Sequence, residues 1–452
     1  KKRSYSQSIF IHNAHFTKNP NLYNSYFYGT IGLSLLKGRD MKKIIVLLFI
    51  CLFCSFCPLV SADDFDVAAK NAIAFDLNTG KILYEKEATS PVPIGSLTKL
   101  LSAYLVYDAI KAEKITMDSQ VEISEYALKL TTNYDISNLP LDKGSYSVEE
   151  LLEASLIANA NSATIALAEK ISGSEKKFVD LMKAKLKEWG ISDAKIVNST
   201  GLNNSHLGDN IYPNSKKDEE NQLSAYDMAL ISYHLIKDYP QVLNITEKTS
   251  FNFDGLEVNS SNYMLKDMPS YRKGVDGLKI GISDQGGLSF IASANERDMR
   301  LITVVLNVEN AEEDIKALFL ATASVMDYIA NNFVVTTLAE KGTPYEDSHI
   351  SIINGNEDQI KAIASNNLNI IQRIGSDLEP KVTFKKNKQE FKAPLAAHTP
   401  IGTLSYKDTD LIGKGYLKEQ PSITMETEKE VAQGFFLKVW WNNFVEYVNK
   451  KL

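Results

Sequence analysis

The sequence predicts a mixed α/β domain, a small all-β sandwich and a C-terminal amphipathic helix, in that order. Residues 63–333 alternate strand-like and helix-like segments, which indicates one α/β unit. Helical periodicity is lost over residues 335–428, where turn residues separate short strand-like pieces. Residues 429–452 combine adjacent tryptophans with a narrow polar stripe, which is typical of an amphipathic helix.

The N-terminal part has the pattern of a secretory signal peptide. A charged start at Met41–Lys43 precedes an apolar run, Ile44–Val60, that ends in small residues. We expect cleavage after Ala62, so residues 41–62 are the predicted signal peptide, and residues 1–40 are interpreted as an upstream translated or disordered segment. The alternative is an uncleaved membrane anchor, although the run is at the short end for a membrane span.

Composition excludes several classes of function. All three cysteines lie in the apolar run, so the chain after residue 62 has no thiol for a disulfide, a zinc site or catalysis. The first 62 residues hold eight Lys/Arg and one Asp, which leaves 41 basic and 55 acidic residues in 63–452, a net charge of −14. This balance argues against nucleic acid as a partner. Histidine is scarce, with no pair at metal-ligand spacing, so we predict no metal and no cofactor.

The first element of the α/β domain is a predicted β-hairpin. Strand-like runs at 71–77 and 81–85 flank the turn Asn78-Thr79-Gly80. Gly95 then marks the start of a helix, and residues 100–110 form an apolar run long enough to be a buried helix.

Further elements follow from the same signals. Helices are predicted at 148–158, 162–172, 223–236 and 312–332, paired strands at 288–294 and 300–308, and short strands of the β-sandwich at 349–353, 381–384, 390–393 and 423–426. Gly173 closes the second of these helices, and Ser224 is the expected N-cap of the third. Residues 358–371 fit a helix as an alternative to strands.

The most informative feature is the spacing of three short motifs. Ser96-Leu-Thr-Lys99 is followed 63 residues later by Asn159-Ala-Asn161, and Lys279-Ile-Gly281 begins 120 residues after Asn159. The first pattern, S-x-x-K, occurs at four other places, so the hairpin before Ser96 and the helix after it select this copy.

A serine at a helix N-terminus with a lysine one turn later can perform nucleophilic chemistry. The lysine acts as the base if burial lowers its pKa. The alternative is that Ser96 is an N-cap and Lys99 a solvated first-turn residue.

Together the three motifs resemble the S-x-x-K, S-x-N and K-T-G motifs of the serine penicillin-interacting enzymes. With the hairpin, the segments 93–99 and 145–152, and Gly274–Gly281, the chain is similar to low-molecular-mass penicillin-binding proteins, the D-alanyl-D-alanine carboxypeptidases with a C-terminal β-domain and an amphipathic anchor. The resemblance covers residues 63–452. It implies a penicillin-binding/β-lactamase-like transpeptidase fold, of α/β (α+β) class, for residues 63–333.

The resemblance also implies an activity. Ser96 would attack the peptide bond between two terminal D-alanines, Lys99 would be the general base, and Asn161 would hydrogen-bond the substrate amide. Water would then hydrolyse the acyl-enzyme. The implied partners are peptidoglycan stem peptides ending in D-Ala-D-Ala, and β-lactams that acylate Ser96.

The third motif supplies the implied binding site for the substrate. Lys279 would attract the terminal carboxylate, and Gly281 would let the substrate approach the strand closely. The N–H groups of Ser96 and Ile282 would form the oxyanion hole.

Two motif positions depart from the family pattern. Asn159 replaces a serine whose hydroxyl relays a proton toward the leaving amine, a task an amide cannot perform in the same way. Ile280 replaces a threonine that bonds the substrate carboxylate, and losing such a bond costs about 1.5–3 kcal/mol.

These departures leave other functions open. One alternative is a slow or non-catalytic penicillin-binding or cell-wall peptide-binding protein. A β-lactamase is a third reading, without a Glu-x-x-x-Asn signature for deacylation. Ser162 offers a second register for the middle motif, but we expect it to cap the following helix.

The C-terminal segment predicts a location. Lys438, Asn442, Glu446 and Asn449 form one polar stripe, and aromatic residues that include Trp440 and Trp441 cover the remaining face. Such a helix lies in a membrane interface. The alternative is a helix docked on the protein's own core. We therefore expect an exported protein that is peripheral at the outer face of the cytoplasmic membrane and bound through residues 429–452.

Overall fold

The computed structural model describes residues 65–388 and 390–451. The predictions made for residues 1–40 and for the signal peptide at 41–62 lie outside the described residues. None of the helices within the described ranges combines the length and hydropathy needed to cross a bilayer.

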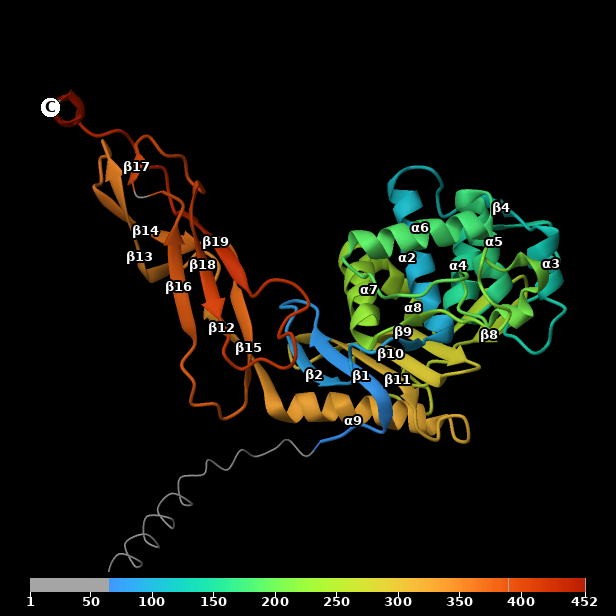
Figure 1. The fold of residues 1–452 in the computed structure, drawn as a ribbon. Coiled ribbons are helices and arrows are strands. Elements are labelled where there is room, and N and C mark those ends of the chain that lie inside the picture. The colour runs from blue at the N-terminus through green and yellow to red at the C-terminus, as the bar shows by residue number, and fades with distance from the viewer. Residues whose placement is uncertain (1–64, 389, 452) are drawn as a thin grey trace, which may run out of the picture. The chain divides into compact units, whose positions relative to one another are not determined.

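The α/β part of the chain extends through α9 (Figure 1). Its elements are β1 (Ala69–Asp76), β2 (Ile82–Lys86), β3 (Val92–Pro93), the 3-10 turn η1 (Gly95–Thr98), α2 (Lys99–Lys111), β4 (Gln120–Glu122), α3 (Glu125–Leu130), β5 (Ser145–Ser147), α4 (Val148–Leu156), α5 (Asn161–Ser172), α6 (Glu175–Glu188), η2 (Asn204–His206), η3 (Gly208–Asn210), β6 (Gln222–Leu223), α7 (Ala225–Asp238), η4 (Pro240–Val242), α8 (Leu243–Thr246), β7 (Ser250–Phe253), β8 (Leu256–Asn259), β9 (Val275–Ser283), β10 (Gly287–Glu296), β11 (Met299–Val308) and α9 (Lys316–Asn332).

The remaining elements are mostly strands. They are β12 (Phe333–Ala339), β13 (Pro344–Ile353), β14 (Gln359–Ala364), β15 (Leu368–Arg373), β16 (Lys381–Lys386), β17 (Glu390–Lys392), β18 (Pro400–Lys407), β19 (Ser422–Thr427) and α10 (Phe436–Lys451).

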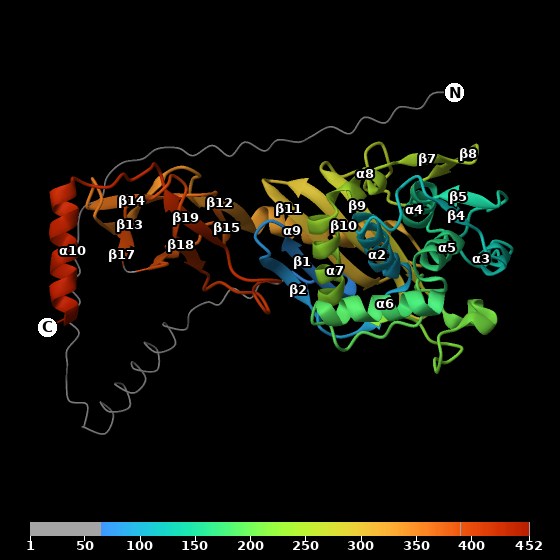
Figure 2. The same ribbon diagram turned by 90° about the horizontal axis from the view of Figure 1, so that it is seen from above.

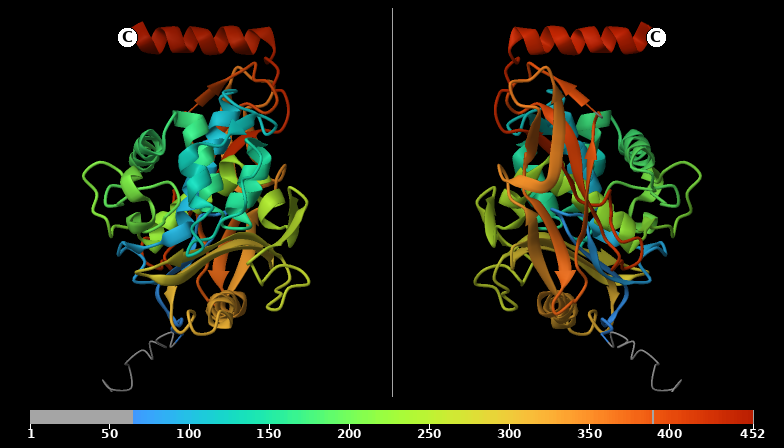
Figure 3. Two further views of the ribbon diagram at one scale, coloured as in Figure 1. Left: turned by 90° about the vertical axis from the view of Figure 1, so that its right-hand side faces the viewer. Right: turned by 90° about the vertical axis from the view of Figure 1, so that its left-hand side faces the viewer.

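A five-stranded antiparallel sheet, in the order β2-β1-β11-β10-β9, forms the centre of the α/β domain. Alternate residues of a strand point to opposite faces, so β1 contributes to two cores. Ile73 and Phe75 pack with the helices that include α2 and α7, whereas Ala72 and Ala74 pack on the α9 side. Figures 2 and 3 show α9 on one face of the sheet and the larger group of helices on the other.

Most of the predicted elements of this domain are confirmed. The hairpin is β1 and β2, and its turn is closed by Asp76, whose Oδ2 accepts from the N–H of Thr79 at 2.8 Å. The paired strands are β10 and β11. Ser224 caps α7 as expected, in a reciprocal capping box with Asp227.

The predicted role of Ser162 is wrong. The N-cap of α5 is Ala160, and Ser162 is the second residue of the helix. The backbone N–H of Ser162 donates to Asn138 Oδ1 at 2.8 Å, so a distant loop satisfies it. The hydroxyl of Ser162 is buried without a hydrogen-bond partner among the described residues. The final helix also starts later than expected, at Lys316.

The β-domain has its own core. A six-stranded sheet in the order β16-β18-β19-β14-β13-β17 and the pair β12-β15 surround a cluster that includes Ile350, Ile352, Leu404 and Met425. The helical alternative for 358–371 is wrong, because this stretch forms β14 and most of β15. Tertiary pairing decides the outcome, since β14 lies between β13 and β19.

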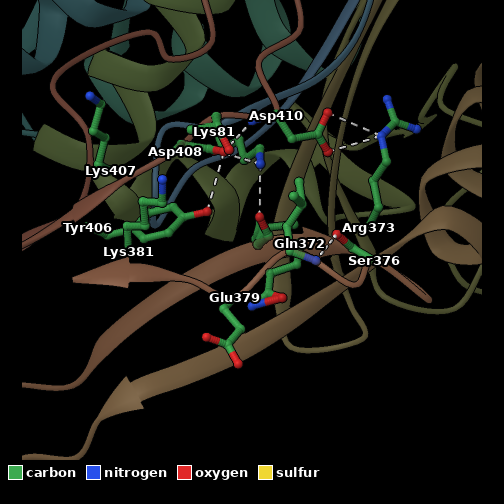
Figure 4. A pocket seen from close by; sticks show the side chains of 13 residues that line it. Lys81, Gln372, Arg373, Ser376, Glu379, Lys381, Tyr406, Lys407, Asp408 and Asp410 are labelled. Atoms are coloured by element: carbon green, nitrogen blue, oxygen red, sulfur yellow. Dashed lines mark hydrogen bonds and ion pairs between the residues drawn. The ribbon is translucent and has the colours of Figure 1, made fainter.

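A buried ion pair joins Lys81, the residue before β2 of the α/β domain, to the β18–β19 connection (Figure 4). Lys81 Nζ lies 2.7 Å from Asp408 Oδ2, each side chain is 1% exposed, and the lysine also donates to the carbonyl of Ile371 at 2.9 Å. The Tyr416 hydroxyl donates to the same carboxylate oxygen at 2.7 Å. The pair therefore has the additional hydrogen bonds that buried charges need.

We expect Lys81→Ala to lower the free energy of unfolding by about 3–5 kcal/mol, because it leaves Asp408 buried without a counter-charge. The double change Lys81→Met with Asp408→Leu should recover most of this loss. Denaturant titration of each variant measures the effect. Lys429→Ala, in the exposed pair with Glu357, is the control and should change little. A single variant as stable as the wild type would contradict the expectation.

Candidate active site

The structure brings the predicted site residues together where η1 and α2, the α4–α5 connection and β9 meet. Ser96 lies in η1 and Lys99 is the first residue of α2. Asn159 and Asn161 flank the start of α5, and the Lys279–Ile282 segment belongs to β9. Their catalytic and binding roles stay predictions, but their convergence on one site is a property of the fold.

Two glycines let η1 approach β9 closely. Gly95 has φ +50°, and a Cβ added to it would lie 2.0 Å from the carbonyl oxygen of Ile282. A Cβ on Gly281 would lie 2.6 Å from Leu97 Cγ. Any larger side chain at either position would force the two elements apart, so glycine fixes the approach of the serine to the strand.

Lys99 is fully buried beside Ser96. Its Nζ lies 2.9 Å from Ser96 Oγ, and it donates to Asn161 Oδ1 at 2.7 Å and to the Thr200 carbonyl at 3.2 Å. The Asn161 amide is oriented by its Nδ2, which donates to the carbonyl of Ser137 at 2.9 Å. Asn161 Oδ1 and the Thr200 carbonyl oxygen can only accept hydrogen bonds.

This arrangement suits a neutral amine. A neutral amine has two N–H groups and one lone pair, so the two carbonyl oxygens take the hydrogens and the lone pair is left for the Ser96 hydroxyl. The pKa of Lys99 is lowered well below its usual value, first by burial and then by the charge of Lys279. The solvated first-turn lysine considered from the sequence is therefore wrong.

Sequence reasoning missed Thr200 and Ser137, which contribute backbone carbonyls. Thr200 belongs to a turn in which Asn198 Oδ1 accepts from the N–H of Gly201 at 2.7 Å. Gly201 has φ +85°, and a Cβ there would lie 1.8 Å from the carbonyl oxygen of Gly95. The run Asn198-Ser-Thr-Gly201 is a turn signal, but nothing in it indicates contact with a lysine.

Asn159 and Lys279 form a second buried pair. Asn159 adopts a left-handed conformation, φ +61°, which asparagine tolerates better than most residues. Its Oδ1 accepts from Lys279 Nζ at 2.9 Å. Lys279 is 2% exposed, and burial lowers its pKa from 10.5 to about 7.

Ile280 of the third motif and Ile282, which follows the motif, differ in exposure. Ile280 pairs with Phe290 of β10 and packs in the core on the α9 side. Ile282 is 49% exposed. Ile280, which replaces threonine, therefore adds to the packing of the sheet, whereas the side chain of Ile282 is open to solvent.

No group of three or more His, Cys, Asp or Glu in residues 65–388 and 390–451 could hold a metal ion.

Comparison with known proteins decides the family. Residues 59–310 match the model described as D-alanyl-D-alanine carboxypeptidase, and residues 333–432 match that of the penicillin-binding protein 5 C-terminal domain. The chain belongs to the D-alanyl-D-alanine carboxypeptidase family. The resemblance, the two-part fold and the carboxypeptidase assignment made from the motifs are thereby confirmed at the level of the family.

Relatives match over most of their length. D-alanyl-D-alanine carboxypeptidase DacF of Bacillus subtilis is 28% identical over 82% of this chain and 88% of its own. DacC of Escherichia coli is 28% identical over 90% of this chain and 95% of its own. Among solved structures, a peptidoglycan synthesis regulatory factor (PBP3) from Streptococcus pneumoniae is 52% identical, with a TM-score of 0.78 over 81% of this chain and all of that one. Penicillin-binding protein 5 from Haemophilus influenzae is 27% identical, with a TM-score of 0.64 over 82% of this chain and all of that one.

Burial of Lys279 predicts a pH-dependent stability. Between its folded pKa of about 7 and its usual value of 10.5, the unfolded chain holds a proton that the folded chain has lost. The free energy of unfolding therefore gains a contribution that rises with pH across this window. We expect Lys279→Met to reduce that slope, measured by urea unfolding at pH 7 to 10. An unchanged slope would mean that Lys279 keeps its ordinary pKa.

Proposed function

We propose that this protein removes the terminal D-alanine from peptidoglycan stem peptides through an acyl-enzyme on Ser96. The observation that supports this most directly is the geometry of Lys99, whose Nζ lies 2.9 Å from Ser96 Oγ and also contacts two carbonyl oxygens that can take its hydrogens. A serine hydroxyl is a weak nucleophile until such a base is beside it. Membership of a carboxypeptidase family supplies the reaction class.

The chemical steps follow from the positions of the groups. Lys99 takes the proton of Ser96 as its oxygen attacks the carbonyl carbon of the penultimate D-alanine. The N–H groups of Ser96 and Ile282 stabilise the oxyanion, and the close approach of η1 to β9 supports this pairing. Terminal D-alanine leaves, and water then releases the shortened peptide. β-Lactams that mimic the terminal dipeptide would acylate the same oxygen.

Asn161 has a role in this proposal beyond contact with substrate. Its Oδ1 holds Lys99 and its Nδ2 holds the Ser137 carbonyl, so one amide N–H is left to meet the substrate. Lys279 would attract the terminal carboxylate. Because Ile280 is packed in the core, the hydroxyl that the family places at this position has no substitute on that side chain.

The competing function is a slow or non-catalytic protein that binds wall peptides and penicillin. The observation that favours it is Asn159, since its amide cannot pass a proton as a hydroxyl does. Penicillin would still acylate Ser96, but a peptide substrate would release its D-alanine slowly or not at all, because the leaving nitrogen would lack a proton.

Release of D-alanine distinguishes the two functions. We expect residues 63–452, in mild detergent, to release D-alanine from a muramyl-type peptide ending in D-Ala-D-Ala. Ser96→Ala should abolish release, because it removes the nucleophile. Labelling by fluorescent penicillin is measured on the same samples. Ser96-dependent labelling without D-alanine release would establish the binding protein instead.

We also propose that the exported chain is held at the outer face of the cytoplasmic membrane by α10. Its aromatic face is exposed and includes Phe436, Trp440, Trp441, Phe444 and Tyr447. Residues of its polar stripe, and not the aromatic residues, contact the β-domain. This arrangement supports binding to a membrane over docking of the aromatic face on the protein's own core. Lys438 Nζ lies 2.7 Å from Asp358, and Asn442 donates to Asn354 Oδ1 at 3.0 Å. An aromatic face with terminal lysines is suited to a bilayer interface.

Flotation with anionic vesicles tests the membrane proposal. We expect residues 63–452 to float with the lipid and a variant ending at residue 428 to stay in solution. Changing both Trp440 and Trp441 to serine should weaken binding strongly, because it removes apolar area from the exposed face. Tyr271→Ser, at an exposed aromatic residue of the α/β domain, is the control. Equal flotation of the truncated variant would refute the role of α10.

A further inference from the structure

We propose that Lys279 itself delivers the proton to the leaving amine nitrogen of D-alanine, a step that the family assigns to a serine hydroxyl. This inference rests on the proposed carboxypeptidase function. It concerns the one chemical task in that reaction for which the altered second motif leaves no hydroxyl.

The need for an acid follows from the leaving group. An amide nitrogen leaves poorly unless it gains a proton as the C–N bond breaks. Asn159 stands where a hydroxyl would relay that proton, and its carboxamide neither accepts nor releases protons near neutral pH. Its Oδ1 is instead the acceptor of a hydrogen bond from Lys279 Nζ at 2.9 Å.

Lys99 is poorly placed for this second task. Lys99 Nζ has three contacts, with Asn161 Oδ1, the Thr200 carbonyl oxygen and Ser96 Oγ. The proton that Lys99 takes from Ser96 therefore lies between the lysine and the serine oxygen. That oxygen needs the same proton again when the acyl-enzyme breaks down.

Lys279 has donors to spare. Asn159 Oδ1 is the one hydrogen-bond acceptor that the described residues give to its Nζ, so two of the three N–H groups of an ammonium remain for a ligand. The side chain is 2% exposed, which keeps competing water away. Burial lowers its pKa to about 7, so the ammonium is present at neutral pH and is acidic enough to give up a proton.

The two lysines complete a balanced cycle. In acylation the Ser96 Oγ–C bond forms and the C–N bond breaks, while Lys99 gains the serine proton and Lys279 gives one to the departing nitrogen. In deacylation the water oxygen bonds to the carbonyl carbon and the C–Oγ bond breaks. Lys279 takes the proton from water, and Lys99 returns its proton to Ser96. Both lysines end in their starting states, and no other reactant is required.

In this scheme Asn159 is a positioning residue for the acid. Its left-handed backbone, φ +61°, and its single hydrogen bond to Lys279 hold the ammonium beside the residue that replaces the serine of the family pattern. An asparagine there is then compatible with turnover.

A change of leaving group tests the proposal. Two substrates are compared, a peptide ending in D-Ala-D-Ala and the same peptide with thiolactate as the last unit. The thioester keeps the terminal carboxylate, but its thiolate leaves without needing a proton. Lys279→Arg keeps the positive charge for that carboxylate and cannot release a proton. We expect the rate constant of acylation, measured in a single turnover, to fall about 100-fold or more for the amide and to stay within about threefold for the thioester.

Lys273→Arg, the same change at an exposed position just before β9, is the matched control and should leave both rates unchanged. Asn159→Ala provides a second variant, which removes the acceptor of Lys279 without altering any charge. It should slow acylation by the amide more than acylation by the thioester.

Other outcomes have distinct meanings. Equal losses of the acylation rate constant on the two substrates in Lys279→Arg would overturn the proposal and leave Lys279 as a carboxylate-binding residue. Wild-type protein that cleaves neither substrate in a Ser96-dependent manner would instead refute the proposed function on which the inference rests.

Discussion

The burial of one amine beside one hydroxyl is the constraint on which the rest of the site depends. In the proposed mechanism Lys99 acts as a base only when it is neutral, and burial makes its charged form costly. Burial alone does not orient the amine of Lys99. Its hydrogens have two acceptors from separate segments, Asn161 Oδ1 and the Thr200 carbonyl oxygen. The sheet, α2, α5 and the turn at Thr200 must all be in place before this geometry exists.

The local chain conformation was largely predictable where short-range signals decide it. The turn Asn78-Thr79-Gly80 and the capping box of Ser224 act within four residues, and both elements formed as expected. Errors arose where distant contacts intervene. At Ser162 a side chain from another loop satisfies the N–H, so α5 begins one residue earlier. In the stretch 358–371, pairing with neighbouring strands overrides a sequence that also fits a helix.

The active site was predictable to the extent that side chains carry it. Motif spacing identified Ser96, Lys99, Asn159, Asn161 and Lys279, and the fold places these five together. Thr200 and Ser137 could not be found in this way, because they act through main-chain oxygens that every residue possesses. The direction of Ile280 into the core likewise depends on the face of β9 that packs against α9.

The two edge strands of the central sheet, β2 and β9, differ in what covers them. At the β2 edge the chain supplies its own cover, because the N–H of Ile82 donates to the Gly415 carbonyl and the N–H of Leu417 donates to that of Gly80. An uncovered edge strand invites pairing with another molecule and aggregation. β9 stands at the other end of the strand order, beside the turn η1 that holds Ser96. The β-domain therefore protects the edge that must not recruit a strand, while the β9 edge is left for an extended peptide to pair with at the proposed site of cleavage.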